Sequence, residues 1–471
     1  MLQAIEVNIS FLRKLAVLGL GGLACLGVSE QTLCAETPAP RILTRVVFQD
    51  DEARTLRWAD VMAGTPPTLG PIRPVAGFPQ LDPEHQTLVQ MEAAKGFVLV
   101  GVRDDDDGQH QSGWVLIETG VAEDDHGDHS HWTYPQEPKV RAAVLDNKQG
   151  NPAHLYCYDN IFYLANDRLN GYTRVDPAAV KPTDDSAAVA RRAAFFQGGG
   201  RHITLAVSGG TVGYGTWTDR EGPDKGRVDV TEINATGNQQ IACTFHLPHG
   251  GLHGATACQG KIFLAPSEGV TWFATPNTAP VDPKSITLRQ WSLGKEGDKP
   301  VRTGAFTTSG KHVAFVTGGG PTAAIHLVDA SAAEPVPVKL TVPMAAGNRP
   351  AGLEIVRARK GSPLAFLFHD HAADVEAPHR LSLIELDPNL DGAWNDARVA
   401  NELDVGKSRV EGHGGHHSVA FDADRRRAVF SNPGSGTLTL FALEDRKPLA
   451  DWTVGGVPSK VILVGGRASH D

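Results

Sequence analysis

Three histidines lie within a short segment of the sequence that contains almost no apolar side chains. The segment AEDDHGDHSHW covers residues 122–132 and spaces His126, His129 and His131 as HxxHxH among aspartates. Imidazole is a common ligand of divalent metal ions, and carboxylates raise the local concentration of cations by Coulomb attraction. The segment therefore predicts a flexible metal-binding loop, and the alternative is a solvated acidic loop that holds no ion.

A second set of histidines falls where short apolar strands are expected to begin or end. These histidines occur in NPAHLY, GGRHITL, GGLHGA, FHDHA and GHGGHHSVAF, as His154, His202, His253, His371, His416 and His417. Imidazoles from separate strands can supply three or four nitrogen ligands to one zinc ion. The alternative is a hydrogen-bonded polar surface without metal. Taken alone, His85, His312 and His326 are best explained as hydrogen-bonded core residues.

The elements that must position these histidines are short strands. Apolar or β-branched runs such as FVLVGV, IFYLAN, KIFLAP and AVFSNP alternate with turn residues, and no long stretch has a helical period, so the chain is all-β. The second strand of each repeat begins near Phe97, Ile161, Thr211, Ile262, His312, Leu364 and Ala428. Four of the six intervals are 50–52 residues and two are 64 residues. This single period predicts a seven-bladed β-propeller rather than a pair of β-sandwiches.

Blade geometry predicts where the histidines lie. The first strand of a blade starts at one mouth of the central channel and the second strand returns to it, so histidines at those positions are expected to converge. The loop at 122–132 follows a third strand and is expected on the opposite face. The strand at 41–48 is expected to complete the sheet that holds the last strands, which closes the ring and covers open strand edges.

The N-terminus resembles a secretory signal. Arg13 and Lys14 precede an apolar run from Leu15 to Val28, which is shorter than the roughly 20 residues that span a bilayer. We expect cleavage after Ala35, which gives a signal peptide at 1–35 and a single propeller domain at 36–471. A lipoprotein with Cys25 lipidated is the alternative.

Charge and cysteine content narrow the function classes. The net charge is −10, and the expected signal peptide carries equal numbers of acidic and basic residues, so the mature chain stays acidic. Nucleic-acid binding is not expected. The sequence has no GxSxG, HExxH, Walker or dinucleotide-binding motif. Cys243 and Cys258 either form a disulfide or are, with Cys157, buried thiols.

The motifs DDHGDHSHW, NPAHLY, HGGLHGA, FHDHA and GHGGHHSVAFD together resemble the AztD family of periplasmic zinc metallochaperones, which work with a zinc ABC uptake system. The resemblance implies zinc as the bound metal, the periplasm as the location, handover to the transporter's solute-binding protein, and no chemistry on an organic substrate. The alternatives are a metal-dependent propeller enzyme such as a lactonase, or an interaction propeller without metal. Nitrogen ligands do not distinguish zinc from copper or nickel.

Overall fold

The computed structural model describes residues 41–104, 110–127, 129–234, 237, 240–372, 375–411 and 414–469. The predicted signal peptide at 1–35 and Asp128 of the acidic segment lie outside these residues. Among the described residues, no helix has the length and apolar character needed to cross a membrane.

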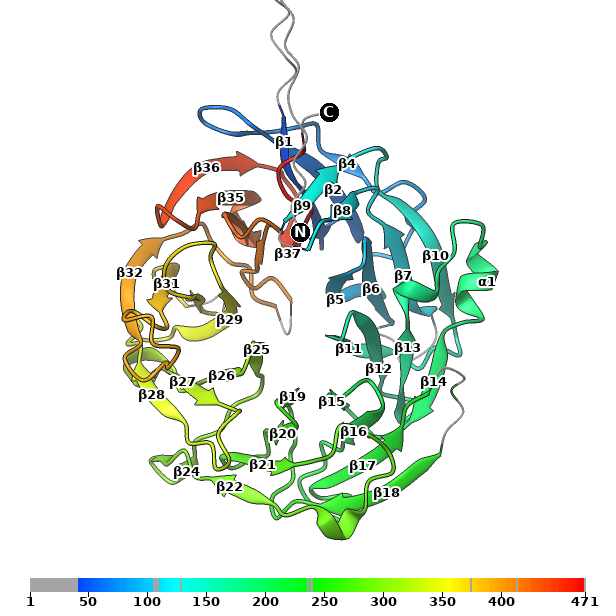
Figure 1. Ribbon diagram of the computed structural model, residues 1–471, viewed down its shortest axis with the longest axis vertical. Coiled ribbons are helices and arrows are strands. Elements are labelled where there is room, and N and C mark those ends of the chain that lie inside the picture. Colours follow the sequence, from blue (N-terminus) through cyan, green and yellow to red (C-terminus); the bar gives the residue numbers. More distant parts are fainter. Residues whose placement is uncertain are drawn as a thin grey trace, which may run out of the picture. The chain divides into compact units, whose positions relative to one another are not determined.

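The described residues form a β-propeller within the unit Pro40–Asp471, with blades arranged around a ring (Figure 1). Each blade is an antiparallel sheet whose strands follow one another from the centre outward. The strands form where the sequence has β-branched and aromatic runs, and inner strands such as β34 (Arg427–Asn432) are almost entirely buried.

Seven blades are each built from one continuous stretch of chain. From the innermost to the outermost strand, the first four consist of β5 (Gln86–Ala94), β6 (Phe97–Asp104), β7 (Ser112–Glu118) and β10 (Lys139–Asp146); β11 (Pro152–Tyr158), β12 (Ile161–Asn166), β13 (Gly171–Val175) and β14 (Ala194–Gln197); β15 (Leu205–Ser208), β16 (Val212–Thr216), β17 (Arg227–Glu232) and β18 (Ile241–His246); and β19 (Ala255–Cys258), β20 (Lys261–Leu264), β21 (Val270–Ala274) and β22 (Arg289–Trp291).

The next three blades consist of β25 (Thr307–Ser309), β26 (His312–Thr317), β27 (Ala324–Asp329) and β28 (Val338–Thr341); β29 (Arg349–Val356), β30 (Leu364–Asp370), β31 (Arg380–Glu385) and β32 (Arg398–Asp404); and β33 (Val419–Phe421), β34, β35 (Thr437–Ala442) and β36 (Lys447–Thr453). The connections carry two small hairpins and short helical turns: β8 (Ala122–Asp125) with β9 (Ser130–Thr133), β23 (Lys295–Glu296) with β24 (Lys299–Pro300), α1 (Ser186–Ala190), η1 (Pro177–Ala179), η2 (Pro283–Ser285), η3 (Gly320–Thr322) and η4 (Pro433–Ser435).

The two ends of the chain build one more blade, so the described residues form eight blades, not seven. Its innermost strand is β37 (Pro458–Val464), followed by β1 (Ile42–Asp50), β2 (Thr55–Met62) and two short strands, β3 (Thr68–Leu69) and β4 (Arg73–Pro74). We expected the N-terminal strand to complete the sheet of the last strands, but β36 already completes that sheet. The sequence period counts only contiguous blades, and this blade is split between both chain ends.

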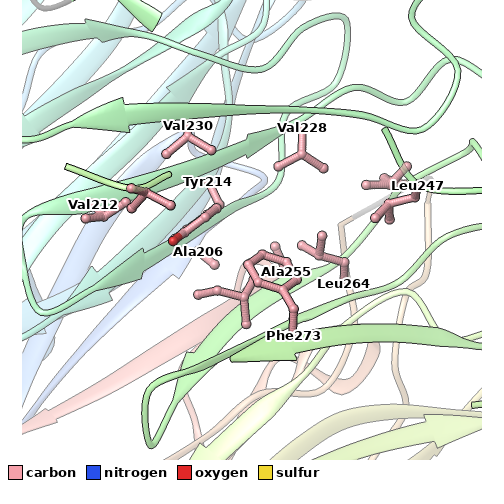
Figure 2. Close-up of a cluster of buried hydrophobic side chains, with 12 residues drawn as sticks. Ala206, Val212, Tyr214, Val228, Val230, Leu247, Ala255, Leu264 and Phe273 are labelled. Atoms are coloured by element: carbon pink, nitrogen blue, oxygen red, sulfur yellow. The ribbon is translucent and has the colours of Figure 1, made fainter. Parts of the chain in front are cut away.

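The core lies between the blades. The buried side chains form eight clusters, each shared by two neighbouring blades. In one of them, Tyr214 and Val230 of the β15–β18 blade pack against Leu264 and Phe273 of the next blade (Figure 2). The cluster that joins the terminal blade to β34 and β35 closes the ring.

The predicted disulfide is wrong. Cys157, Cys243 and Cys258 are all free thiols. Cys243 packs into the core on one side of the β19–β22 blade and Cys258 into the core on the other side, so the blade separates their sulfur atoms.

Candidate metal centre

Three of the predicted histidines come together from three consecutive blades. His154 lies on β11, His202 precedes β15 and His253 precedes β19. Each residue lies where the innermost strand of its blade begins, so all three side chains reach the same mouth of the central channel (Figure 1). We call His154, His202 and His253 the triad.

The triad has the spacing of metal ligands. One ligand atom of each histidine lies within 4.8 Å of the others, and the Nε2 atoms of His154 and His202 are 3.0 Å apart. Two nitrogens on one tetrahedral zinc ion are separated by about 3.3 Å, given bonds of about 2.0–2.1 Å. The ring centroid of His253 is 5.0 Å from that of His202 and 5.8 Å from that of His154.

Groups behind the rings fix two of the three orientations. The Nδ1 atom of His202 lies 3.1 Å from Oδ2 of Asp167, whose other oxygen accepts the backbone N–H of Ile203. The Nδ1 atom of His253 lies 3.4 Å from the carbonyl oxygen of Gly304, which only accepts hydrogen bonds. A neutral imidazole that donates from Nδ1 has its lone pair on Nε2, the arrangement that partners of metal-bound histidines usually impose.

The electrostatic surroundings of His253 favour its neutral, metal-binding form. Burial lowers the pKa of His253, and the charge of His202 lowers it further. Only neutral imidazole binds a metal ion, so a lowered pKa reduces competition by protons.

The triad opens into a cavity of about 900 Å³ at the mouth of the channel. The cavity is also lined by Arg103, His416, Arg409, Glu411 and Lys460. Three nitrogen ligands on one side of an open cavity leave a coordination position for water or an incoming ligand. Such a site exchanges its ion more easily than a closed four-ligand site.

A second group of histidines surrounds a buried aspartate across the mouth. Asp370, at the end of β30, contacts Nδ1 of His417 with Oδ1, and its Oδ2 lies 3.0 Å from Nδ1 of His416. Oδ2 also accepts the backbone N–H of His417. His379 has a ligand atom within 4.8 Å of those of Asp370 and His417. We call Asp370, His379, His416 and His417 the Asp370 cluster.

Most nitrogen atoms of this second group already face acceptors. His417 is fully buried, and its Nε2 lies 2.9 Å from the carbonyl oxygen of Gly406. Both nitrogens of His371 lie 2.9 Å from carbonyl oxygens, those of Ala372 and Ala377. A metal ion at either ring must displace one of these contacts, whereas His416 also lines the large cavity.

The Asp370 carboxylate is held in its charged form. Burial raises the pKa of Asp370, but hydrogen bonds from His416 and His417 outweigh burial and hold the pKa well below its usual range. Burial, together with the charges of His371 and His417, lowers the pKa of His379 to about 4.

The six channel histidines therefore do not form one site, as we expected. His154, His202 and His253 converge, whereas His371, His416 and His417 belong to blades on another part of the ring and surround Asp370. The expectation failed because strand position places a histidine at the mouth but does not determine where its ring points or which blade lies beside it.

The acidic segment is a hairpin rather than an irregular loop. In β8 and β9, Asp124 pairs with His131 and Asp125 with Ser130, and Gly127 turns the chain with a positive φ of 86°. The ring centroids of His126, His129 and His131 lie 5.0–5.2 Å apart. The three imidazoles are thus gathered at an exposed tip.

The hairpin lies at the end of the propeller opposite the triad, as expected from strand order. Strand β37 begins at Pro458, and Ser459 and Lys460 line the triad cavity. The chain beyond the other end of β37 contacts the hairpin, where the backbone N–H of Ser469 donates to the carbonyl of Trp132 at 3.1 Å. An ion at the hairpin is therefore not shared with the triad.

Sequence reasoning missed Asp167, Asp370 and His379. Asp167 and Asp370 follow or end second strands, so strand position was a usable signal for them, but many polar residues share that position. The structural interpretation of two other histidines agrees with the structure: His326 lies 3.0 Å from Oγ1 of Thr317, and His312 stacks on Trp394 with centroids 3.7 Å apart.

The fold and the site together define a β-propeller with a histidine-lined mouth cavity. No family model and no curated protein matches the chain. Among solved structures, apo AztD and a second AztD crystal structure, both from Citrobacter koseri, match with a TM-score of 0.62. Each is 14% identical to this chain, and the match covers 91% of this chain and 100% of the other.

At this identity the likeness shows a shared fold, so the expected resemblance to AztD is confirmed at the level of the fold. A putative 6-phosphogluconolactonase from Bacteroides uniformis also matches, at 10% identity over 91% of this chain and 99% of the other. Its TM-score of 0.43 is too low to support an argument about function.

Proposed function

We propose that this protein is a periplasmic zinc metallochaperone, which binds zinc at the triad and delivers it to the solute-binding protein of a zinc ABC transporter. The convergence of three imidazoles from separate blades carries the proposal. The AztD fold and the predicted signal peptide at 1–35 support it. In this proposal zinc is cargo and the protein transforms no organic substrate.

The open side of the triad suits transfer. An acceptor protein can insert its own ligand through the cavity and take over the ion stepwise, while the histidines release it one at a time. Arg103 and Arg409 in the cavity wall oppose the accumulation of cations there, which favours release.

The direct test is zinc transfer between purified proteins. Zinc-loaded mature protein is mixed with its metal-free solute-binding protein in a stopped-flow instrument, with and without a competing chelator. We expect transfer that is faster than dissociation into the chelator and that is lost in His154→Ala/His202→Ala. The control is His246→Ala, an exposed histidine on the outer strand β18. Transfer no faster than free dissociation contradicts delivery by direct contact.

We propose that the β8–β9 hairpin is an auxiliary zinc-binding element, with His126, His129 and His131 as ligands. Because it lies on the opposite face, its removal is expected to leave the triad intact. Deletion of residues 124–131 should remove additional bound zinc and leave the propeller folded, since strands β8 and β9 contribute no side chain to the core clusters. Unchanged zinc content and transfer rate after the deletion would contradict a role for the hairpin.

A metal-dependent hydrolase is the second candidate, and one observation favours it. Beside the triad lies a cavity of about 410 Å³ lined by Arg103, Arg168 and Arg201, together with Asp167. A zinc ion on three histidines activates water, and arginines suit an anionic substrate. A screen of zinc-loaded protein with lactones and anionic esters tests this candidate: turnover that disappears in His154→Ala/His202→Ala would support it.

A further inference from the structure

A third group of metal-ligating side chains lies at the rim of the first contiguous blade. Asp82 and His85 lie in the turn before β5, and His110 precedes β7. One ligand atom of each lies within 4.8 Å of the others. We call these three residues the rim cluster. They are distant in sequence, and only the pairing of β5, β6 and β7 brings them together.

The side chains of the rim cluster already contact one another. The Nδ1 atom of His85 lies 3.1 Å from Oδ1 of Asp82, and the rings of His85 and His110 are stacked with centroids 4.1 Å apart. The side chains of His85 and Asp82 are 33% and 40% exposed. An ion can therefore reach the cluster from solvent without any opening of the core.

Buried hydrogen bonds fix the two segments that carry the cluster. The backbone N–H of Asp82 donates to Oε1 of Gln86 at 2.8 Å, and the amide of Gln86 donates to the carbonyl of Gln111. The backbone N–H of His110 donates to Oδ2 of Asp104 at 3.0 Å. Gln86 and Asp104 are both buried. The backbone positions of the three candidate ligands are thus set before an ion binds, which lowers the entropic cost of binding.

We propose that Asp82, His85 and His110 form a binding site for a divalent first-row metal ion, separate from the triad. Two imidazoles and one carboxylate are a ligand set that such ions favour, with water at the remaining positions. The lone pairs of two parallel rings lie in parallel planes, so one ring must turn about its Cβ–Cγ bond for both to face the ion. Partial exposure of His85 leaves space for this rotation.

The position of the rim cluster relates it to the triad. Pro83, between the candidate ligands Asp82 and His85, lines the same large cavity as the triad. An ion at the rim cluster thus lies beside the entrance that an ion must pass to reach the triad. The site itself does not depend on the proposed function, because it is defined by its own ligands.

The test uses the mature protein with His154→Ala/His202→Ala, which removes the triad but leaves the rim cluster. Co²⁺ is titrated while its visible absorption is followed, and bound Co²⁺ at saturation is measured by equilibrium dialysis. We expect His110→Gln or His85→Gln, added to this background, to remove one bound ion and the associated absorption. Asp82→Asn should weaken binding and change the spectrum, since it replaces a charged oxygen ligand.

His246→Gln in the same background is the matched control and should bind as the background does. Thermal unfolding of the metal-free variants shows that each is folded. Equal stoichiometry and affinity in the background, His85→Gln and His110→Gln would overturn the proposal. That result would leave the triad untested, so the failure of this site and the failure of the proposed function are distinct.

Discussion

The triad and the Asp370 cluster contain the same two residue types, histidine and aspartate, in opposite arrangements. In the triad, Asp167 lies behind the ring of His202, and the other ring nitrogens face a shared centre. In the Asp370 cluster, the carboxylate itself is the centre, and His416 and His417 point toward it. A carboxylate behind a ring prepares the ring to bind a metal ion, whereas a carboxylate in front of it satisfies the nitrogen directly.

The two arrangements imply different roles. Asp370 ends a strand of the β29–β32 blade, and His416 and His417 precede the β33–β36 blade, so their contacts tie neighbouring blades together. The triad also joins neighbouring blades, but it faces an open cavity. We therefore expect substitutions in the triad to change zinc affinity and substitutions in the Asp370 cluster to change stability.

The largest expected effect is on zinc affinity. His154→Ala/His202→Ala removes two of three nitrogen ligands and should weaken zinc binding by more than about 100-fold, beyond the about 10–100-fold loss typical for second-shell changes. The midpoint of unfolding of the metal-free protein should change little. Competition titration with a zinc chelator measures the affinity. A comparable loss in His417→Ala, with the triad intact, would break the distinction between the two regions.

Asp370→Asn should give the largest loss of stability, about 3–5 kcal/mol, because it removes the charged partner of a fully buried histidine. Denaturant unfolding of metal-free protein measures this loss. Zinc affinity should remain close to that of the wild type. Loss of zinc affinity with unchanged stability would mean that the Asp370 cluster, not the triad, holds the metal.

The stabilising effect of Asp370 should depend on pH. Its folded-state pKa lies below its unfolded value of about 3.9, so its contribution is complete above about pH 3.9 and is lost as the pH falls through the folded value. The difference in unfolding free energy between wild type and Asp370→Asn should therefore shrink on acidification. A difference that stays constant into strong acid would contradict a charged Asp370.

A smaller effect is expected from the residue behind the triad. Asp167→Asn removes the negative charge that orients and polarises His202 and should weaken zinc binding by about 10–100-fold. The comparison of Asp167→Asn with Asp370→Asn, by chelator competition and by unfolding, sharpens the distinction between the two carboxylates. Equal zinc affinities in both variants would remove it.

The smallest effect is a shift in pH midpoint. Zinc loading should fall on acidification as protons displace the metal from imidazole, and because burial lowers the pKa of His253, the fall should begin below the usual histidine value of about 6.5. Zinc titrations across a pH series measure this midpoint. Loss of loading above the usual histidine pKa would contradict neutral, buried ligands.

The all-β class, the blade period and closure by both chain ends were readable from the sequence, because strand alternation and turn residues are local signals. The same signals placed His154, His202 and His253 at the start of innermost strands. The acidic segment at 122–132 was found by composition alone, and strand order placed it on the face opposite the triad.

The tertiary structure decided what local patterns do not contain. The eighth blade joins β37 to β1 across more than 400 residues, so no repeat in the chain records it. Whether a histidine faces other histidines or a carboxylate depends on which blades are neighbours: His202 meets Asp167 and His417 meets Asp370 only after the ring closes. The rim cluster likewise exists only because strand pairing brings His110 beside Asp82 and His85.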